Sequence, residues 1–175
     1  DASAQYELGM RYERELQRGR EIPQDGKEAV KWFQLAAEQG HAHAQSNMGS
    51  RFYEGRDVTQ NKKEALNLFK LSAENGIVTS QLYLGWMYYQ GMETQKDDLK
   101  AFKWWKLAAE QVNDEDQNSL HRGEWNMYSI ENFSEYSLLQ RSENALGQMY
   151  EQGRIVQQDY KEAVRWYRHA IRKQF

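Results

Sequence analysis

The sequence predicts an all-α solenoid of four helix-turn-helix repeats with one insertion. Three observations predict it. A short motif, Leu84-Gly85-x-x-Tyr88, has counterparts beginning at Leu8, Met48 and Leu146. A second pattern of alanines and aromatic residues follows each copy, and glycines separate the two. Because the apolar positions recur every three or four residues, each pattern predicts one amphipathic helix, and neither helix could bury its apolar stripe alone.

The first repeat, about residues 1–40, has a long first helix. Twenty residues separate Gly9 from Ala29, whereas sixteen separate Gly49 from Ala65. Four extra residues are close to one helical turn, so we expect the first helix to end near Gly19.

The second and third repeats cover about residues 41–76 and 77–111. Gly55 and Gly91 stand where a left-handed residue would end the first helix of each pair. Further candidate helix-ending glycines are Gly19, Gly40, Gly76 and Gly153, and the residues expected to cap the second helices at their N-termini are Asp25, Asn61, Asp97 and Asp159.

The fourth repeat, about residues 140–175, follows an insertion of about residues 112–139. Sixty-two residues separate Ala101 from Ala163, where the period predicts thirty-six. The insertion is acidic yet contains aromatic residues, which favours docking onto the solenoid or a projecting contact patch. From Phe133 onward we expect an extended first helix of repeat four, which leaves Trp125 and Tyr128 as the better candidates for partner contact.

The glycine of the first motif returns inside each first helix. Glycine costs about 1 kcal/mol against alanine in an exposed helix. Its return at Gly9, Gly49, Gly85 and Gly147 therefore predicts close approach of a neighbouring helix.

Composition excludes several functions. The formal charge of −3 gives no electrostatic footprint for nucleic acid, and no apolar run is long enough to span a membrane. Cysteine is absent, so disulfides and thiolate metal sites are excluded. The chain opens on Asp1 without an initiator Met, so its N-terminus looks trimmed. We expect a monomer from the periplasm or cytoplasm of a bacterium, favouring the periplasm.

The Leu-Gly-x-x-Tyr motif, the alanine-aromatic pattern and the 36-residue period together resemble the Sel-like repeat family, which is similar to tetratricopeptide proteins. The clearest stretches are residues 24–40 and 44–55. The resemblance covers all of the chain except the insertion. It implies a right-handed superhelix whose first helices line a concave face, and a role as an adaptor, a regulator or a toxin-neutralising partner.

Positions beside the motif differ from repeat to repeat, as a groove for one specific protein partner requires. The candidate partner-binding residues in the helices are Arg11, Asn47, Arg51, Tyr53, Tyr83, Trp86 and Tyr89. Two alternatives stay open. Tyr83 and Trp86 would equally suit packing between repeats, and Tyr53 and Tyr89 are similarly ambiguous. For either arginine alone, an ordinary solvated surface is the better interpretation.

No motif of an enzyme, a metal site or a cofactor site is found in the sequence, so we expect no catalysis, cofactor or metal. We therefore predict a protein-binding module whose groove and insertion hold a protein partner, with an immunity protein that neutralises a secreted effector as the narrower hypothesis. One alternative is an envelope or signalling scaffold with several weak partners. The other is a cell-wall peptide hydrolase, with Glu124 and Glu131 as the residues to substitute.

Overall fold

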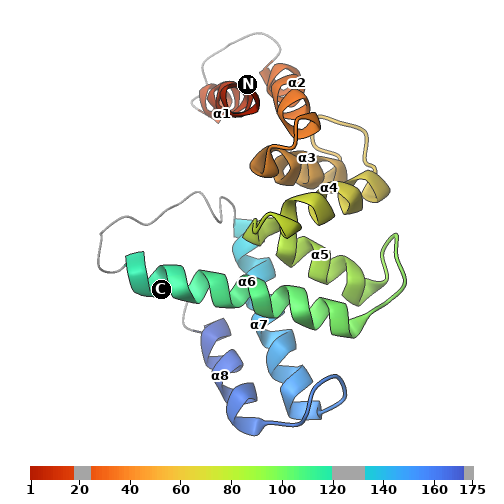
Figure 1. Ribbon diagram of the computed structural model, residues 1–175, viewed down its shortest axis with the longest axis vertical. Helices are drawn as coiled ribbons and strands as arrows, with labels where there is room; N and C mark the ends of the chain where they lie inside the picture. The colour runs from red at the N-terminus through yellow and green to blue at the C-terminus, as the bar shows by residue number, and fades with distance from the viewer. Residues whose placement is uncertain (18–24, 120–132, 172–175) are drawn as a thin grey trace. The chain divides into compact units, whose positions relative to one another are not determined.

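A computed structural model describes residues 1–17, 25–119 and 133–171 (Figure 1). These residues form α-helices and no strand, which confirms the predicted all-α solenoid class. The helices are α1 (Ala2–Gln17), α2 (Asp25–Glu38), α3 (Ala42–Glu54), α4 (Lys62–Glu74), α5 (Val78–Gln90), α6 (Asp98–Ser119), α7 (Phe133–Gln152) and α8 (Tyr160–Ile171).

Consecutive helices pair as the repeats predict, with α1, α3, α5 and α7 as the first helices and the others as the second helices. The first helix α1 has 16 residues against 13 in α3 and α5, so its predicted extra length is confirmed. Gly40 follows the end of α2 and Gly76 follows the end of α4. The third repeat has no glycine at this position, and α6 continues to Ser119. The helix α7 begins at Phe133, so the described ends of the insertion lengthen both neighbouring helices.

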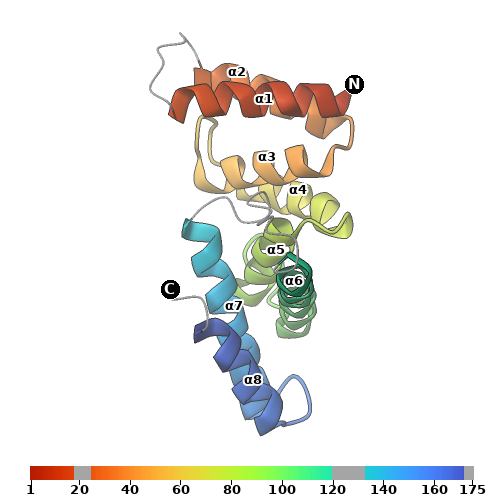
Figure 2. The same cartoon turned by 90° about the vertical axis from the view of Figure 1, so that its left-hand side faces the viewer.

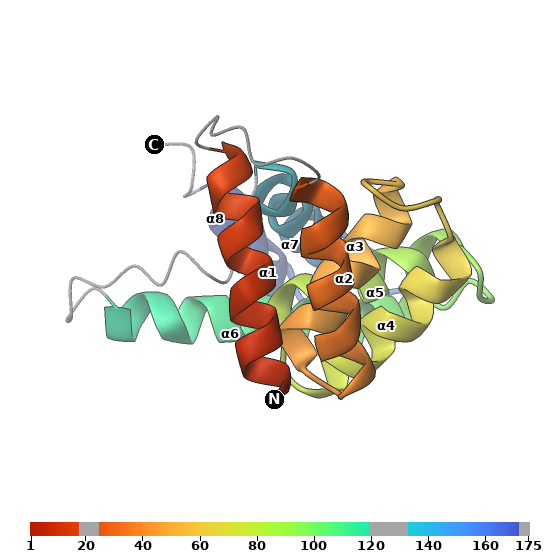
Figure 3. The same ribbon diagram turned by 90° about the horizontal axis from the view of Figure 1, so that it is seen from above.

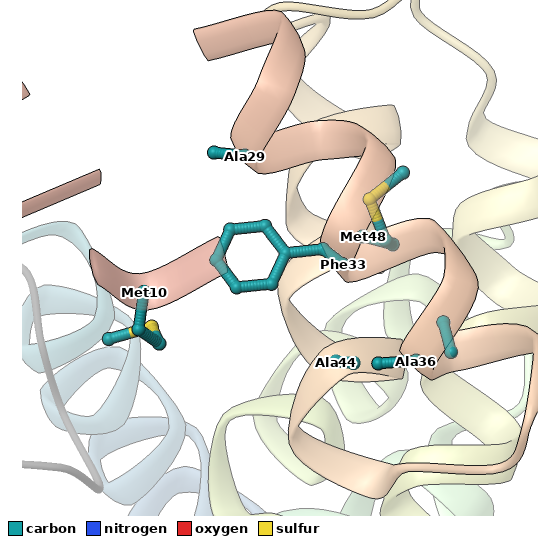
Figure 4. Close-up of a cluster of buried hydrophobic side chains, with 7 residues drawn as sticks. Met10, Ala29, Phe33, Ala36, Ala44 and Met48 are labelled. Atoms are coloured by element: carbon teal, nitrogen blue, oxygen red, sulfur yellow. The ribbon is translucent and has the colours of Figure 1, made fainter. Parts of the chain in front are cut away.

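The chain divides into two compact units, Asp1–Ser80 and Gln81–Phe175. In the first unit, α1 and α2 lie side by side (Figures 2 and 3), and α3 packs against α2. Phe33 of α2 is fully buried among Met10, Ala44 and Met48, which come from α1 and α3 (Figure 4). Burying a side chain of this size contributes roughly 1.5–3 kcal/mol.

In the second unit, two tryptophans of the second helices are fully buried. Trp105 of α6 donates its indole N–H to the carbonyl oxygen of Leu82 in α5, at 3.3 Å. Trp166 of α8 lies in the pair that α8 forms with α7. Each tryptophan therefore anchors a second helix in its repeat.

The glycine of each first helix lies against an aromatic ring of its own second helix. A Cβ atom added to Gly85 would stand 2.5 Å from Trp105 Cδ1, too close for any real contact. The four pairs are Gly9 with Phe33, Gly49 with Phe69, Gly85 with Trp105 and Gly147 with Tyr167. The predicted close approach is confirmed, and the neighbour is the partner helix of the same repeat.

The predicted helix ends are confirmed wherever they lie among the described side chains. Gly55 adopts a left-handed φ of 76° and donates its N–H to the Arg51 carbonyl oxygen. Asn61 accepts a hydrogen bond from the Glu64 N–H at 3.1 Å, and Asp97 and Asp159 cap α6 and α8 in the same way. Gly19 and the Asp25 side chain lie outside the described residues. One cap was not predicted: His41 Nδ1 accepts from the Ala44 N–H at 3.2 Å and caps α3.

Candidate functional site

The sequence predicts Arg51 as a groove residue. In the structure it lies buried in the first unit, with 1% of its surface exposed. Its guanidinium donates to Glu13 at 2.6 Å and to Asp57 at 2.7 Å, and its Nε donates to Asn47 at 2.8 Å. It also lies 5.3 Å from the ring centroid of Phe33. Because these partners come from α1, α3 and the segment after α3, Arg51 ties the first repeat to the second.

The prediction that Arg51 is a groove residue is therefore wrong. Arg11 stands at the same position of α1 and is exposed, whereas Arg51 already has its carboxylate partners inside the unit. Asn47, half-buried, orients Arg51. Both residues of α3 serve the fold in this structure.

Tyr83 is buried as well, with 6% of its surface exposed. It therefore packs between helices and is not a free residue of a groove. Met87, four residues further along α5, is fully buried. The helix α5 contains no charged residue, and a helix that is apolar on most sides is an enclosed one. That absence of charge was the signal in the sequence for the burial of Tyr83.

Trp86, like Tyr89, is only half-buried on α5, whereas Tyr83 is buried. The Arg141 guanidinium of α7 lies over its indole ring, 4.3 Å from the centroid. Tyr89 stacks beside it with a centroid distance of 6.0 Å and an interplanar angle of 30°. Reasoning from the sequence missed Arg141, because the insertion hides which residue of α7 faces α5.

Tyr53 and Tyr89 occupy the same position in α3 and α5 and are both half-buried. Each has a lysine ammonium over its ring, Lys62 at 5.9 Å and Lys96 at 5.2 Å. Both tyrosine rings thus make a cation–π contact with a lysine of their own repeat.

A shallow cavity of about 180 Å³ opens beside Tyr89 in the second unit. Side chains of α5, of the start of α6, of α7 and of the loops after α5 and α7 form its walls. The lining residues are Tyr89, Lys96, Asp98, Ala145, Gln148, Met149, Gln152, Arg154 and Ile155. We call this cavity, together with Trp86 and Arg141, the α5–α7 surface.

At the fourth repeat, Glu151 takes the position that Tyr53 and Tyr89 hold in α3 and α5. Its carboxylate accepts a hydrogen bond from the Tyr167 hydroxyl at 2.6 Å. Burial first, and then the hydrogen bond and negative charge of Glu151, raise the pKa of Tyr167 to about 12. Tyr167 is therefore a neutral donor at physiological pH, and Glu151 is tied to α8.

Trp125 and Tyr128, predicted in the insertion, lie outside the described residues, as do Glu124 and Glu131. In the part of the chain that the structure describes, no three His, Asp or Glu side chains gather as metal ligands would. No described helix has both the length and the apolar character that crossing a bilayer requires.

The Sel1 repeat model matches the chain four times, at residues 2–41, 42–77, 78–113 and 140–175. The chain belongs to the Sel1 repeat family. The predicted resemblance is thereby confirmed. Sel1 repeats generally mediate protein–protein interaction and are typically non-catalytic scaffolds.

Two solved structures resemble this Sel1 repeat protein over nearly its whole length. A Sel1 repeat protein from Oxalobacter formigenes is 25% identical with a TM-score of 0.70, and the match covers 100% of this chain and 60% of that one. The protective antigen c5321 of uropathogenic Escherichia coli, which displays an SLR fold, is 33% identical with a TM-score of 0.58, over 97% of this chain and 38% of that one. The chain thus spans less than two thirds of either structure. No curated protein matches it.

Proposed function

We propose that this Sel1 repeat protein is a non-enzymatic module that binds a partner protein through the α5–α7 surface. The observation that carries the proposal is that Trp86 is only partly buried, with the Arg141 guanidinium over its indole ring and the Tyr89 ring stacked beside it. Tryptophan, tyrosine and arginine are the residues that most often dominate the binding energy of protein interfaces.

The surroundings of Trp86 support the same role. The Arg141 guanidinium already covers one side of the indole, so the ring is held in place before a partner arrives. A side chain that is ordered in the free protein loses less entropy on binding. The cavity beside Tyr89 offers a recess for a side chain of the partner.

Within this proposal the narrower hypothesis is an immunity protein that neutralises a secreted effector, with Trp125 and Tyr128 of the acidic insertion adding contacts. An acidic segment suits the basic surface of a target. The alternative is a scaffold in the envelope or in signalling. The two differ in the number and strength of their partners.

The test is coexpression of the chain with the product of each neighbouring gene, followed by calorimetric titration of every partner that copurifies. One partner with a nanomolar Kd, about −12 kcal/mol, supports the neutralising role. Several partners with micromolar Kd support the scaffold. Binding that is unchanged when Trp86 and Arg141 are both replaced by alanine contradicts the proposed surface.

A further inference from the structure

The cavity beside Tyr89 stands, in the second unit, at the repeat positions that hold the ion pairs of Arg51 in the first unit. Arg51 follows the motif glycine Gly49 by two residues, and Met149 of the cavity wall follows Gly147 by two. The buried guanidinium of Arg51 is charged, whereas the side chain of Met149 carries no charge. The groups that accept the hydrogen bonds of Arg51 are Asn47, Asp57 and Glu13.

Those three acceptors are replaced by apolar or aromatic residues in the second unit. Counted from the motif glycine of each helix, the replacements are Ala145 for Asn47, Ile155 for Asp57 and Tyr89 for Glu13. All three replacements line the cavity. This wall therefore suits an apolar side chain, which leaves no polar group unsatisfied when it is buried there.

One cation of the first unit is kept in the second unit without its carboxylates. The guanidinium of Arg56 lies 3.9 Å from Glu13 and 3.8 Å from Glu54. Arg154 is the counterpart of Arg56 in the loop after α7, and Gln152 stands where Glu54 would be. Among the residues that the structure describes, Arg154 forms no ion pair.

The other two charged residues of the cavity wall compensate each other. Lys96 Nζ lies 3.6 Å from Asp98 Oδ1. The charge that remains uncompensated is the guanidinium of Arg154, at the edge of an apolar wall. An arginine in this state binds a carboxylate through two parallel N–H···O hydrogen bonds.

The size of the cavity favours one side chain of a larger partner. Its volume of about 180 Å³ is below the range of about 300–1,000 Å³ that encloses a whole small ligand. Its wall includes Tyr89, which stacks on Trp86. A polypeptide held on Trp86 therefore reaches the cavity across Tyr89.

We infer that the cavity receives the C-terminal residue of the partner protein, with an apolar side chain against Met149 and Ile155 and the terminal carboxylate on Arg154. A chain-terminal residue carries both of these groups on one α-carbon. An internal acidic residue would have to place its carboxylate beside the apolar side chain of a different residue. The inference rests on the partner-binding function proposed above and names the group that the partner supplies.

N-acetyl-leucine, which carries an apolar side chain and a carboxylate as a chain terminus does, is the probe for this site. Its titration should shift the ¹³C-methyl NMR signals of Met149 and Ile155, with a Kd of about 1 mM for a ligand of this size. N-acetyl-leucinamide has no charge and should bind about fivefold more weakly. Equal affinity of the two probes, or no shift with N-acetyl-leucine at about 10 mM, overturns the inference.

A third probe separates a chain terminus from an internal acidic residue. N-acetyl-glutamyl-leucinamide has its carboxylate on an internal side chain and should bind more weakly than N-acetyl-leucine. Binding that is equally tight or tighter overturns the C-terminal assignment.

Two substitutions at exposed positions test the role of Arg154. Gln152→Glu supplies the carboxylate that Glu54 supplies to Arg56, and Arg154→Gln removes the cation. Each should abolish the preference for N-acetyl-leucine over its amide, and a preference that persists in either variant overturns the inference. Arg56→Gln, at the equivalent position of the first unit, is the matched control and should leave both Kd values unchanged. Thermal unfolding verifies that the variants fold.

This inference and the proposed function fail separately. A partner that binds through Trp86 and Arg141, while N-acetyl-leucine does not bind, overturns only the inference about the cavity. Partner binding that is insensitive to Trp86 and Arg141 contradicts the proposed surface, whatever the probes show.

Discussion

Arg11 and Arg51 stand at the same position of successive first helices and have different roles. Arg51 is buried because Glu13 and Asp57 reach it from α1 and from the segment after α3. The side chain of Arg11 is exposed. The repeat pattern predicts that the two arginines share a position. It does not predict that only Arg51 is buried, because the carboxylates that pair with Arg51 come from other segments of the chain.

Replacing Arg51 by methionine should lower the free energy of unfolding by about 3 kcal/mol. The substitution leaves the partly buried carboxylate of Glu13 with only the more distant guanidinium of Arg56, at 3.9 Å. The value is at the low end for a broken buried pair because of this second cation and because the Asp57 side chain is 41% exposed. Arg11→Met is the matched control and should change stability by less than about 0.5 kcal/mol. Urea denaturation measures both, and equal losses would contradict the account of Arg51.

Gly85→Ala should destabilise the second unit by roughly 1–3 kcal/mol, because the added methyl group would overlap Trp105 and force it to move. A double-mutant cycle with Trp105→Leu identifies the cause. The cost of Gly85→Ala should fall by at least half in the Trp105→Leu background. An undiminished cost would point to a reason other than the ring.

His41 should make the first unit more stable at pH 7 than at pH 5. Burial, and then the charge of His43, lower its pKa below 6.5, while Glu7 opposes the shift and the Tyr6 ring stacks on the imidazole. The folded state thus binds a proton less readily than the unfolded state. The resulting stability is present above pH 6.5 and is lost as the pH falls through the folded pKa. Protonation of Nδ1 also removes the acceptor that caps α3.

The comparison with His41→Asn isolates this effect, because asparagine is a good N-cap that does not titrate. Urea denaturation at pH 5 and pH 7 should show a smaller pH dependence in the variant. Equal pH dependence of the two proteins would exclude His41 as the source.

At the scale of the helices, local chemistry was sufficient for prediction. The extra turn of α1 followed from the spacing of Gly9 and Ala29, and the helix starts followed from Asn61, Asp97 and Asp159. These features depend on residues within one or two turns of each other. The side-chain burial around α5 depends on its neighbours, so the sequence left two alternatives open for Tyr83, and the structure places it in the packing between helices.

Asn61→Ala should cost about 1 kcal/mol, because the Glu64 N–H at the start of α4 loses its acceptor. Asn61→Asp keeps an acceptor at the same place and should remain close to the wild type. Thermal unfolding followed by circular dichroism distinguishes the two. Identical losses in both variants would show that the cap contributes nothing measurable.

At the scale of the whole molecule, the repeat pattern predicted the family and the all-α solenoid class, because a repeated glycine and aromatic ring specify one packing unit. The candidate site was only partly predictable. Trp86 was identified from its variable position, whereas Arg141 comes from α7, beyond an insertion that breaks the period. The contact between Arg141 and Trp86 joins two segments far apart in the sequence, and only the three-dimensional structure reveals it.

We propose that Trp86 belongs to a binding surface. Its most direct test is the affinity of the isolated partner for Trp86→Ala, set against Trp104→Ala, a half-buried tryptophan of α6 outside the α5–α7 surface. We predict that Trp86→Ala raises Kd by about 30-fold, as loss of a hot-spot side chain worth about 2 kcal/mol does, with little change in melting temperature. A melting temperature lowered by many degrees, with Kd per folded molecule unchanged, would contradict the claim and place Trp86 in the core.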